Sequence, residues 1–351
     1  MNRFAWLVRR EFWENRSIWV APAIVVAVLL LGAVTGNIFM GDVVVNSDGS
    51  SLTEEQKAAL KEQLGKVESI DDLDTLGQKL DETGQLKGVK KLSPGEALGL
   101  VPVEKQAKLV TVVYTGIAAV MFLVLGTIGF FYALDALYAD RRDRSVLFWK
   151  SLPLSDTETV LAKFTVGAVA IPLVAAAAAV AGQLVVAVGM SLKLAFTGGS
   201  AAILWAPAVL AGVAGSTALI TVASVFWYAP MVAYLLLASA WAPKSPFLWA
   251  VLPPLAVVML EKIAFGTAHL GHFLSFRSFG VLKALARDDS NVPGIVIDDD
   301  NFRGQASATL SDHMSGVIDL MLSPSMLLGL VAAVALLAAA VWVRRYRDET
   351  I

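Results

Sequence analysis

Glu261 and Lys262 stand next to each other inside an apolar run, where charged side chains are usually functional. A charge at the centre of a membrane costs about 2.5–3.5 kcal/mol, so we expect both side chains to face protein or water rather than lipid. Two interpretations stay open. Glu261 lies on a transport path or at a dimer contact, or it is buried in a pair with other spans while the lysine snorkels to the surface.

The histidines raise the question of a metal site or a hydrolase. All three are predicted to lie toward the outer side of the membrane: His269, His272 and His313. On a helix, Glu261 would lie about 16 Å below His272, so a metal site would need the following loop to fold back. We predict no metal site. The sequence has no HExxH or GxSxG motif and no paired glutamates followed by arginine. An intramembrane hydrolase is therefore a minor alternative, and no catalytic residue is expected.

The sequence also lacks the nucleotide-binding motif that an ATP-driven pump would need. No GxxxxGK[ST] sequence occurs, so the chain has no phosphate-binding loop of that type, and a pump of this kind needs ATP and Mg²⁺ to be bound by a partner subunit. The chain has no cysteine, which excludes disulfides, iron–sulfur clusters and thiolate zinc sites. We expect no cofactor in this chain.

The composition indicates a membrane protein. Of 351 residues, 56% are hydrophobic and 17% are charged, with a mean hydropathy of +0.66. A soluble domain would carry about 25% charged residues. The formal net charge of -2 argues against a nucleic-acid partner, and the apolar composition indicates contact with membrane lipids.

Six apolar stretches are long enough to cross a bilayer, and we predict an all-α polytopic membrane protein. They comprise residues 18–39, 108–134, 160–190, 201–240, 247–270 and 325–343. The fourth stretch is ambiguous because it is either one helix kinked near Pro230 or a hairpin of two short spans. The first stretch is too long for a cleaved signal sequence and is expected to be an uncleaved anchor.

The positions of the basic residues favour six spans over seven. With six spans, four segments fall in the cytoplasm: residues 1–17, 135–159, 241–246 and 344–351. They hold 12 of the 28 basic residues, as the positive-inside rule requires. Both termini are then cytoplasmic. Lys163, near the inner end of the third span, is expected to contact lipid headgroups.

Three polar regions lie outside the predicted spans. Residues 1–17 have apolar side chains at helical spacing, which predicts an amphipathic elbow helix at the cytoplasmic interface or a plain extension of the first span. Residues 40–107 form a mostly helical extracytoplasmic insert, which we interpret as a lid or docking surface rather than a catalytic domain. Residues 271–324 form a second extracytoplasmic segment with surface or re-entrant helices.

The cytoplasmic segment 135–159 is short, densely charged and interrupted by Pro153. Ser155 and Glu158 have the spacing of a capping box at the start of the next helix. The aromatic residues Phe148 and Trp149 inside a polar rim are typical of a protein interface. Anchoring by the positive-inside rule alone is the competing interpretation.

This segment resembles the first cytoplasmic loop of ABC-2 type permeases. The likeness lies in the run from Ser151 through Pro153, Ser155 and Glu158 to "LAKF", together with the opening LVRREFWENRSIW. The resemblance implies a coupling helix that docks on a separate ABC ATPase subunit, a second permease copy or paralogue, and export across the bacterial inner membrane by alternating access. The implied coupling residues are Arg141, Arg142, Asp143, Arg144, Leu147, Phe148, Trp149, Lys150 and Pro153.

One departure from the family limits this interpretation, and one alternative function stays open. The insert 40–107 is larger than in the compact polysaccharide and drug exporters of that family, so their substrates do not transfer to this chain. An ATPase-independent secondary transporter is the alternative function, although no inverted repeat or matching pair of broken spans is evident.

Overall fold

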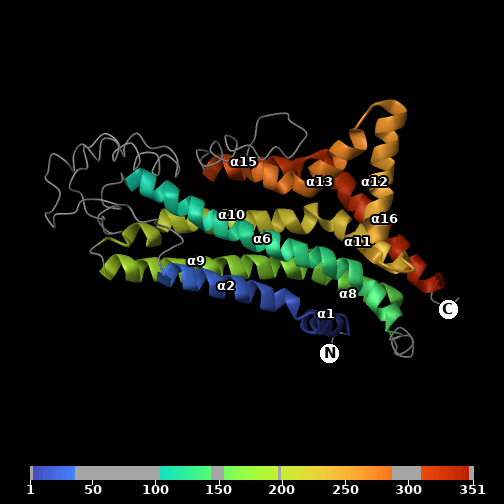
Figure 1. The fold of residues 1–351 in the computed structure, drawn as a ribbon, viewed down its shortest axis with the longest axis horizontal. Coiled ribbons are helices and arrows are strands. Elements are labelled where there is room, and N and C mark those ends of the chain that lie inside the picture. Colours follow the sequence, from blue (N-terminus) through green and yellow to red (C-terminus); the bar gives the residue numbers. More distant parts are fainter. Residues whose placement is uncertain (1–2, 36–102, 144–153, 197–198, 287–309, 348–351) are drawn as a thin grey trace.

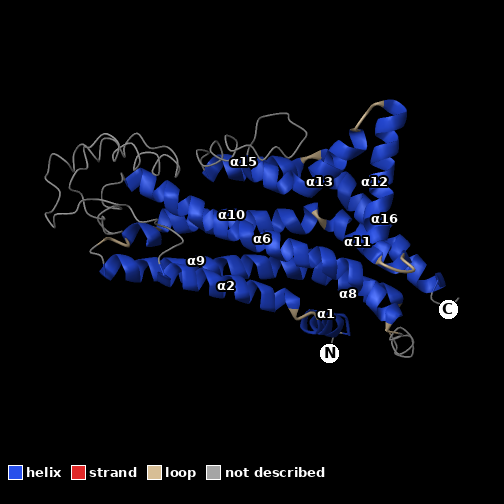
Figure 2. Cartoon of the chain, viewed as in Figure 1, coloured by secondary structure: helices blue, strands red, loops and turns tan. Residues whose placement is uncertain are grey.

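The computed structural model describes residues 3–35, 103–143, 154–196, 199–286 and 310–347, and every regular element in those ranges is a helix (Figures 1 and 2). This result confirms the predicted helical fold class. Five of the helices are long and apolar enough to cross a membrane, which supports the predicted membrane protein. Nearly all of the predicted insert 40–107 lies outside the described residues.

The chain begins with two helices that meet at a bend of 50°, α1 (Arg3–Glu14) and α2 (Ser17–Thr35). Helix α1 is amphipathic, because Leu7, Val8 and Phe12 lie on its buried or half-buried side while Arg3, Arg9 and Glu14 are exposed. The chain thus forms a separate amphipathic helix before the first apolar one, as the sequence predicts. Its contact with a membrane surface stays a prediction.

Two long rods form the centre of the molecule. They are α6 (Val103–Arg142) and a continuous run of α8 (Asp156–Thr165), the π-helical turn η1 (Val166–Ala170) and α9 (Ile171–Phe196). Pro172, two residues after the end of η1, has no N–H to donate to the carbonyl of Ala168, and the wider turn accommodates that missing bond. With 40 residues, α6 is about 60 Å long at 1.5 Å per residue.

Small residues bring α2 close to α9. A Cβ atom at Gly189 would lie 2.8 Å from the Cβ of Ala33, and one at Gly182 would lie 3.0 Å from Ile117 of α6. Membrane helices associate through this kind of close backbone approach, since lipid supplies no hydrophobic driving force between them. The first three apolar segments therefore contact one another, and in Figure 1 α2 and α9 lie along the lower side of the molecule.

The ambiguous fourth stretch is a kinked helix and not a hairpin. After the short η2 (Ala202–Trp205), the chain forms α10 (Pro207–Trp227) and α11 (Ala229–Trp241), which follow one another end to end (Figure 1). The helix breaks at Tyr228, two residues before Pro230, yet the backbone bonds Tyr228 N to Ser224 O and Val232 N to Tyr228 O continue across it.

The last third of the chain forms α12 (Pro246–Phe265), α13 (His269–Ala286), α15 (Leu310–Leu322) and α16 (Pro324–Arg347). Helix α16 packs along α11, and α13 packs on α15 and α10. Helix α12 has the length and composition of a span, but it runs across the direction of the long helices in Figure 1. Ala250 is its one buried residue, so the described residues leave α12 almost uncovered.

One end of the bundle, here called the charged end, contains α1, the end of α6, the start of α8 and the ends of α11 and α16 (Figure 1). The segments predicted to be cytoplasmic therefore have their described residues at the same end of the bundle. Exposed tryptophans gather there as well: Trp6, Trp13, Trp19, Trp241, Trp249 and Trp342. Such aromatic side chains are typical of the interface between membrane and water.

Candidate functional site

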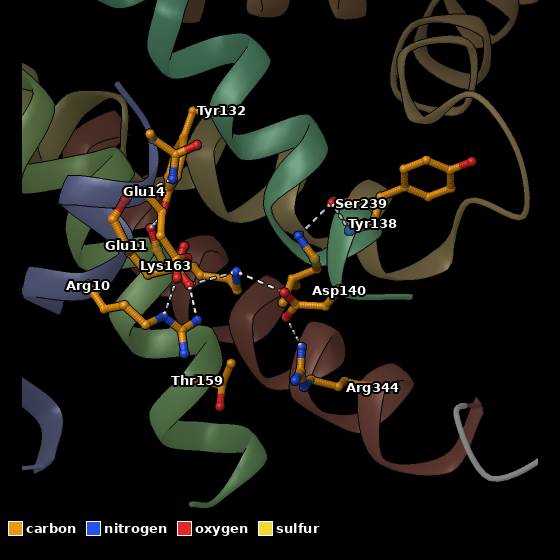
Figure 3. A network of polar contacts seen from close by, with 12 residues as sticks. Arg10, Glu11, Glu14, Tyr132, Tyr138, Asp140, Thr159, Lys163, Ser239 and Arg344 are labelled. Atoms are coloured by element: carbon orange, nitrogen blue, oxygen red, sulfur yellow. Dashed lines mark hydrogen bonds and ion pairs between the residues drawn. The ribbon is translucent and has the colours of Figure 1, made fainter. Parts of the chain in front are cut away.

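Four helices meet at the charged end through a chain of ion pairs, which we call the ion-pair network (Figure 3). Its members come from α1, α6, α8 and α16: Arg10, Glu11, Asp140, Asp156, Lys163 and Arg344. Four of these side chains are buried, and they comprise two acids and two bases. The formal charges of the buried part therefore cancel.

Lys163 is the centre of the network. Its Nζ lies 2.9 Å from Oε1 of Glu11 and 3.4 Å from Oδ1 of Asp140, so one ammonium group joins α1, α6 and α8. Only 3% of Lys163 is exposed. The expectation that Lys163 contacts lipid headgroups is therefore wrong, because the two buried carboxylates hold its charge inside the protein.

Arg344 extends the network to the last helix. Its Nη1 lies 3.0 Å from Oδ2 of Asp140, and its Nε lies 3.1 Å from Oδ1 of Asp156. Asp140 thus accepts from Lys163 with one oxygen and from Arg344 with the other. On the opposite side, Arg10 Nη2 lies 2.8 Å from Oε1 of Glu11.

The network needs all of its members because buried charges are stable only when they are paired. Removing one partner of a buried ion pair typically destabilises a protein by about 3–5 kcal/mol, since the other charge stays desolvated. The buried hydroxyl of Tyr132 adds a further contact and donates to the backbone carbonyl of Lys163 at 3.3 Å. These contacts fix the relative positions of the four helix ends.

The network holds both ends of the predicted coupling segment. Asp140 lies in the last turn of α6, and Asp156 is the first residue of α8, so the network contains a residue from each of the two helices that the coupling segment joins. The predicted capping box is confirmed: Ser155 Oγ accepts from Glu158 N at 3.1 Å, and Glu158 Oε2 accepts from Ser155 N at 2.9 Å. This cap fixes where α8 begins.

Three of the predicted coupling residues are described. Arg141 donates to the carbonyls of Ser239 at 2.6 Å and Ala242 at 2.9 Å, so it ties α6 to the end of α11. Arg142 and Asp143 are exposed, and Nε of Arg142 lies 3.0 Å from Oδ1 of Asp143. Because both side chains are exposed, a partner can reach them. The other predicted coupling residues lie outside the described residues: Arg144, Leu147, Phe148, Trp149, Lys150 and Pro153.

Glu261 and Lys262 lie away from the network, in the last turns of α12 rather than in its middle. Glu261 accepts from the Thr267 hydroxyl at 2.8 Å and from the backbone N–H groups of His269 at 2.7 Å and Leu270 at 2.9 Å. It therefore caps the start of α13. Lys262 is exposed. A transport or dimer role for the pair stays a prediction.

The histidines form no metal centre within the described part of the chain, where no group of three potential ligands comes together. His269 and His272 lie in the first turn of α13. The side chain of His313 lies outside the described residues.

Sequence reasoning missed the network, although a signal is visible in retrospect. Each buried charge continues an apolar stripe by one helical turn: Glu11 follows Leu7, Asp140 follows Leu137 and Ala136, and Arg344 follows Ala340. A charged residue at the end of a buried stripe indicates a counter-charge on another helix. The stripe does not tell which helix carries it.

The site is suited to mechanical connection rather than to chemistry. The indentation beside Arg344, lined by Leu137, Arg141 and Ala240, has no room for a water molecule. The buried acids and bases already satisfy one another, so none of them is available as a general base. Comparison with protein-family models, curated proteins and solved structures finds no significant match for the chain.

Proposed function

We propose that this protein is the membrane-spanning permease subunit of an ATP-driven ABC-2 type transporter that exports its substrate across the bacterial cytoplasmic membrane. The observation that supports the proposal most directly is the ion-pair network. It connects both ends of the coupling segment to α1 and α16, so any displacement of that segment acts on four helices together.

The orientation in this proposal follows from two kinds of residue at one end of the bundle. Arginines at the charged end satisfy the positive-inside rule when that end is cytoplasmic, and the exposed tryptophans would lie at headgroup depth. Six crossings place both termini inside. Because the chain has no cysteine, single cysteines at Ser69 and Ser151 provide a direct test, and we expect labelling from outside and from inside respectively.

The free energy for transport would come from a separate ATPase subunit that binds ATP and Mg²⁺. The coupling segment would dock on this subunit through Phe148 and Trp149, with Arg142 and Arg144 in the surrounding polar rim. Closure of two ATPase subunits would move the segment, and Asp140 and Asp156 would transmit that movement to α6 and α8. Alternating access of this kind is a rigid-body rearrangement around fixed contacts.

A second permease copy or a paralogue completes the transporter in this proposal. Helix α12 provides the supporting observation, because Leu255, Leu260 and Ile263 are exposed and no described helix covers them. An apolar helix of this kind can face lipid or a second subunit. We assign it to the second subunit, close to Glu261 and Lys262.

The deciding experiment attaches a cross-linker to a single cysteine at Ser151 in native membranes and identifies the captured chain by mass spectrometry. We expect a subunit with a phosphate-binding loop. The captured subunit should copurify with the wild type and with the exposed-arginine control Arg345→Glu, and should be lost from the double variant Trp149→Ala, Arg144→Glu. Substrate transport by the reconstituted chain without any ATPase would contradict the proposal.

A further inference from the structure

A second buried charge lies in α13, far from the ion-pair network. Only 5% of Arg277 is exposed. Its Nη2 donates to the carbonyl of Ser325 at 3.0 Å, and its Cζ lies 4.2 Å above the ring of Trp227. Nη1 is buried and has no hydrogen-bond partner among the described residues, and no described carboxylate pairs with the guanidinium.

The surrounding residues hold this guanidinium in place. Trp227 is fully buried and donates from Nε1 to the carbonyl of Arg277 at 2.9 Å, so the ring beneath the cation is fixed to the same turn. Gly329 of α16 faces the guanidinium, and a Cβ atom there would overlap Nη2. Among the described residues, the fold therefore makes room for a cation without placing a carboxylate beside it.

With the ion-pair network at the inner membrane surface, as proposed above, Arg277 lies at membrane depth. Gly329 precedes Arg344 by fifteen residues on α16, which corresponds to about 22 Å along the helix from the ion-pair network. The hydrocarbon core of a bilayer is about 30 Å thick. Unpaired cations at such depth generally mark a ligand or transport path.

An aromatic surface leads from the bilayer to this site. Phe273, Phe276 and Phe279 are exposed on α13 at intervals of three residues, and the Phe276 ring meets Trp227 edge to face at 5.2 Å. A molecule that reaches Arg277 from the side therefore passes over apolar rings. This combination of a buried cation and an apolar approach fits an amphiphile with an anionic head and a hydrocarbon tail.

We propose that Arg277 binds the phosphate group of an anionic lipid, which enters from the bilayer along the phenylalanine surface of α13. Guanidinium groups pair with phosphate through two N–H donors, and Nη1 has a donor available for that role. Phe276 is the side chain that must move to admit the headgroup. The inference is independent of the proposed ATPase, because lipid binding needs only the permease.

The test measures the thermal stability of the purified chain in neutral detergent with three probes: phosphatidylglycerol, an uncharged glycosyl diacylglycerol and soluble glycerol 3-phosphate. We expect only phosphatidylglycerol to raise the melting temperature of the wild type by several degrees. Arg277→Gln should lose most of the increase, and Arg277→Lys should keep part of it. The control Arg345→Gln, which removes an exposed arginine at the charged end, should keep all of it.

An equal increase with the uncharged lipid, or an unchanged increase in Arg277→Gln, would overturn the proposal. An Arg277-dependent increase with glycerol 3-phosphate alone would overturn the lipid source. Photoactivatable phosphatidylglycerol on the wild type gives a second readout that needs no variant. We expect cross-links on residues 273–280 or 325–329, and cross-links confined to α1 and the end of α16 would overturn the assignment.

Discussion

The two buried charge sites of this molecule differ in whether their charges are balanced. At the charged end, two acids and two bases are buried together, and each base contacts a carboxylate within 3.4 Å. In α13, Arg277 is buried among an aromatic ring, a backbone carbonyl and a glycine, without a carboxylate among the described residues. The balanced site connects four helices, whereas the unbalanced cation in α13 is the group that we propose binds a lipid headgroup.

The strongest way to break this comparison is Lys163→Met. The substitution leaves two buried acids with one buried base, and Glu11 keeps only Arg10 as a partner, so we expect a loss of about 3–5 kcal/mol in the free energy of unfolding. Titration with a denaturing detergent, followed by circular dichroism, measures the loss. The double variant Glu11→Gln, Lys163→Met should recover part of it, because the buried charges balance again. Equal stability of Lys163→Met and the wild type would contradict the network.

Gly329→Ala tests the fit around the unbalanced cation. The added methyl group overlaps the guanidinium of Arg277, and we expect destabilisation by about 1–3 kcal/mol as the side chain is displaced. Gly126→Ala is the matched control, since nothing lies within 4 Å of a Cβ atom there. That control should be neutral or stabilising by about 0.5–1 kcal/mol through helix propensity. The same detergent titration compares them.

Ser155→Ala tests the edge of the ion-pair network. The variant loses the hydroxyl that accepts from Glu158 N, and we expect destabilisation by about 1 kcal/mol. Ser155→Asp should retain most of the stability because aspartate also caps helices well. In the transporter that we propose, Ser155→Ala should lower substrate-stimulated ATP hydrolysis more than Ser155→Asp does. An equal effect of both variants would show that the cap does not position α8.

Arg277→Gln should affect stability much less than Lys163→Met, in either direction, which sharpens the contrast between the two sites. The variant loses a cation–π contact of about 2 kcal/mol and one hydrogen bond, but it also removes the desolvation of an unpaired charge. We expect the free energy of unfolding to stay within about 1.5 kcal/mol of the wild type in lipid-free detergent. A loss as large as that of Lys163→Met would mean that Arg277 has a structural counter-charge.

The features predicted correctly from the sequence are local ones. Apolar length predicts membrane-crossing helices because the bilayer sets the length of each run. The capping box at Ser155 and Glu158 was predictable because its two residues are three apart and form their bonds within one turn. Pro230 likewise indicates a break in the fourth apolar run, and the break is found two residues before it.

The two charge sites could not be predicted because they depend on contacts between distant helices. Lys163 and Glu11 are 152 residues apart in sequence, and Arg344 and Asp140 are 204 apart. Their pairing follows from which faces of four helices meet, and a single sequence does not determine that choice. Arg277 was hidden for a related reason, since its burial depends on Trp227 and Gly329 from two other helices.

The π-helical turn η1 has a mechanical consequence for the molecule. It lies between Lys163, which is held at the charged end, and the long outer part of α9 that packs on α2. Along the chain, a twist or axial shift applied to α8 passes to α9 through Val166–Ala170, where the hydrogen bonds span five residues instead of four. Gly167 keeps Val232 of α11 close to this turn. The third membrane helix is thus two rigid pieces whose relative rotation is set by a single widened turn.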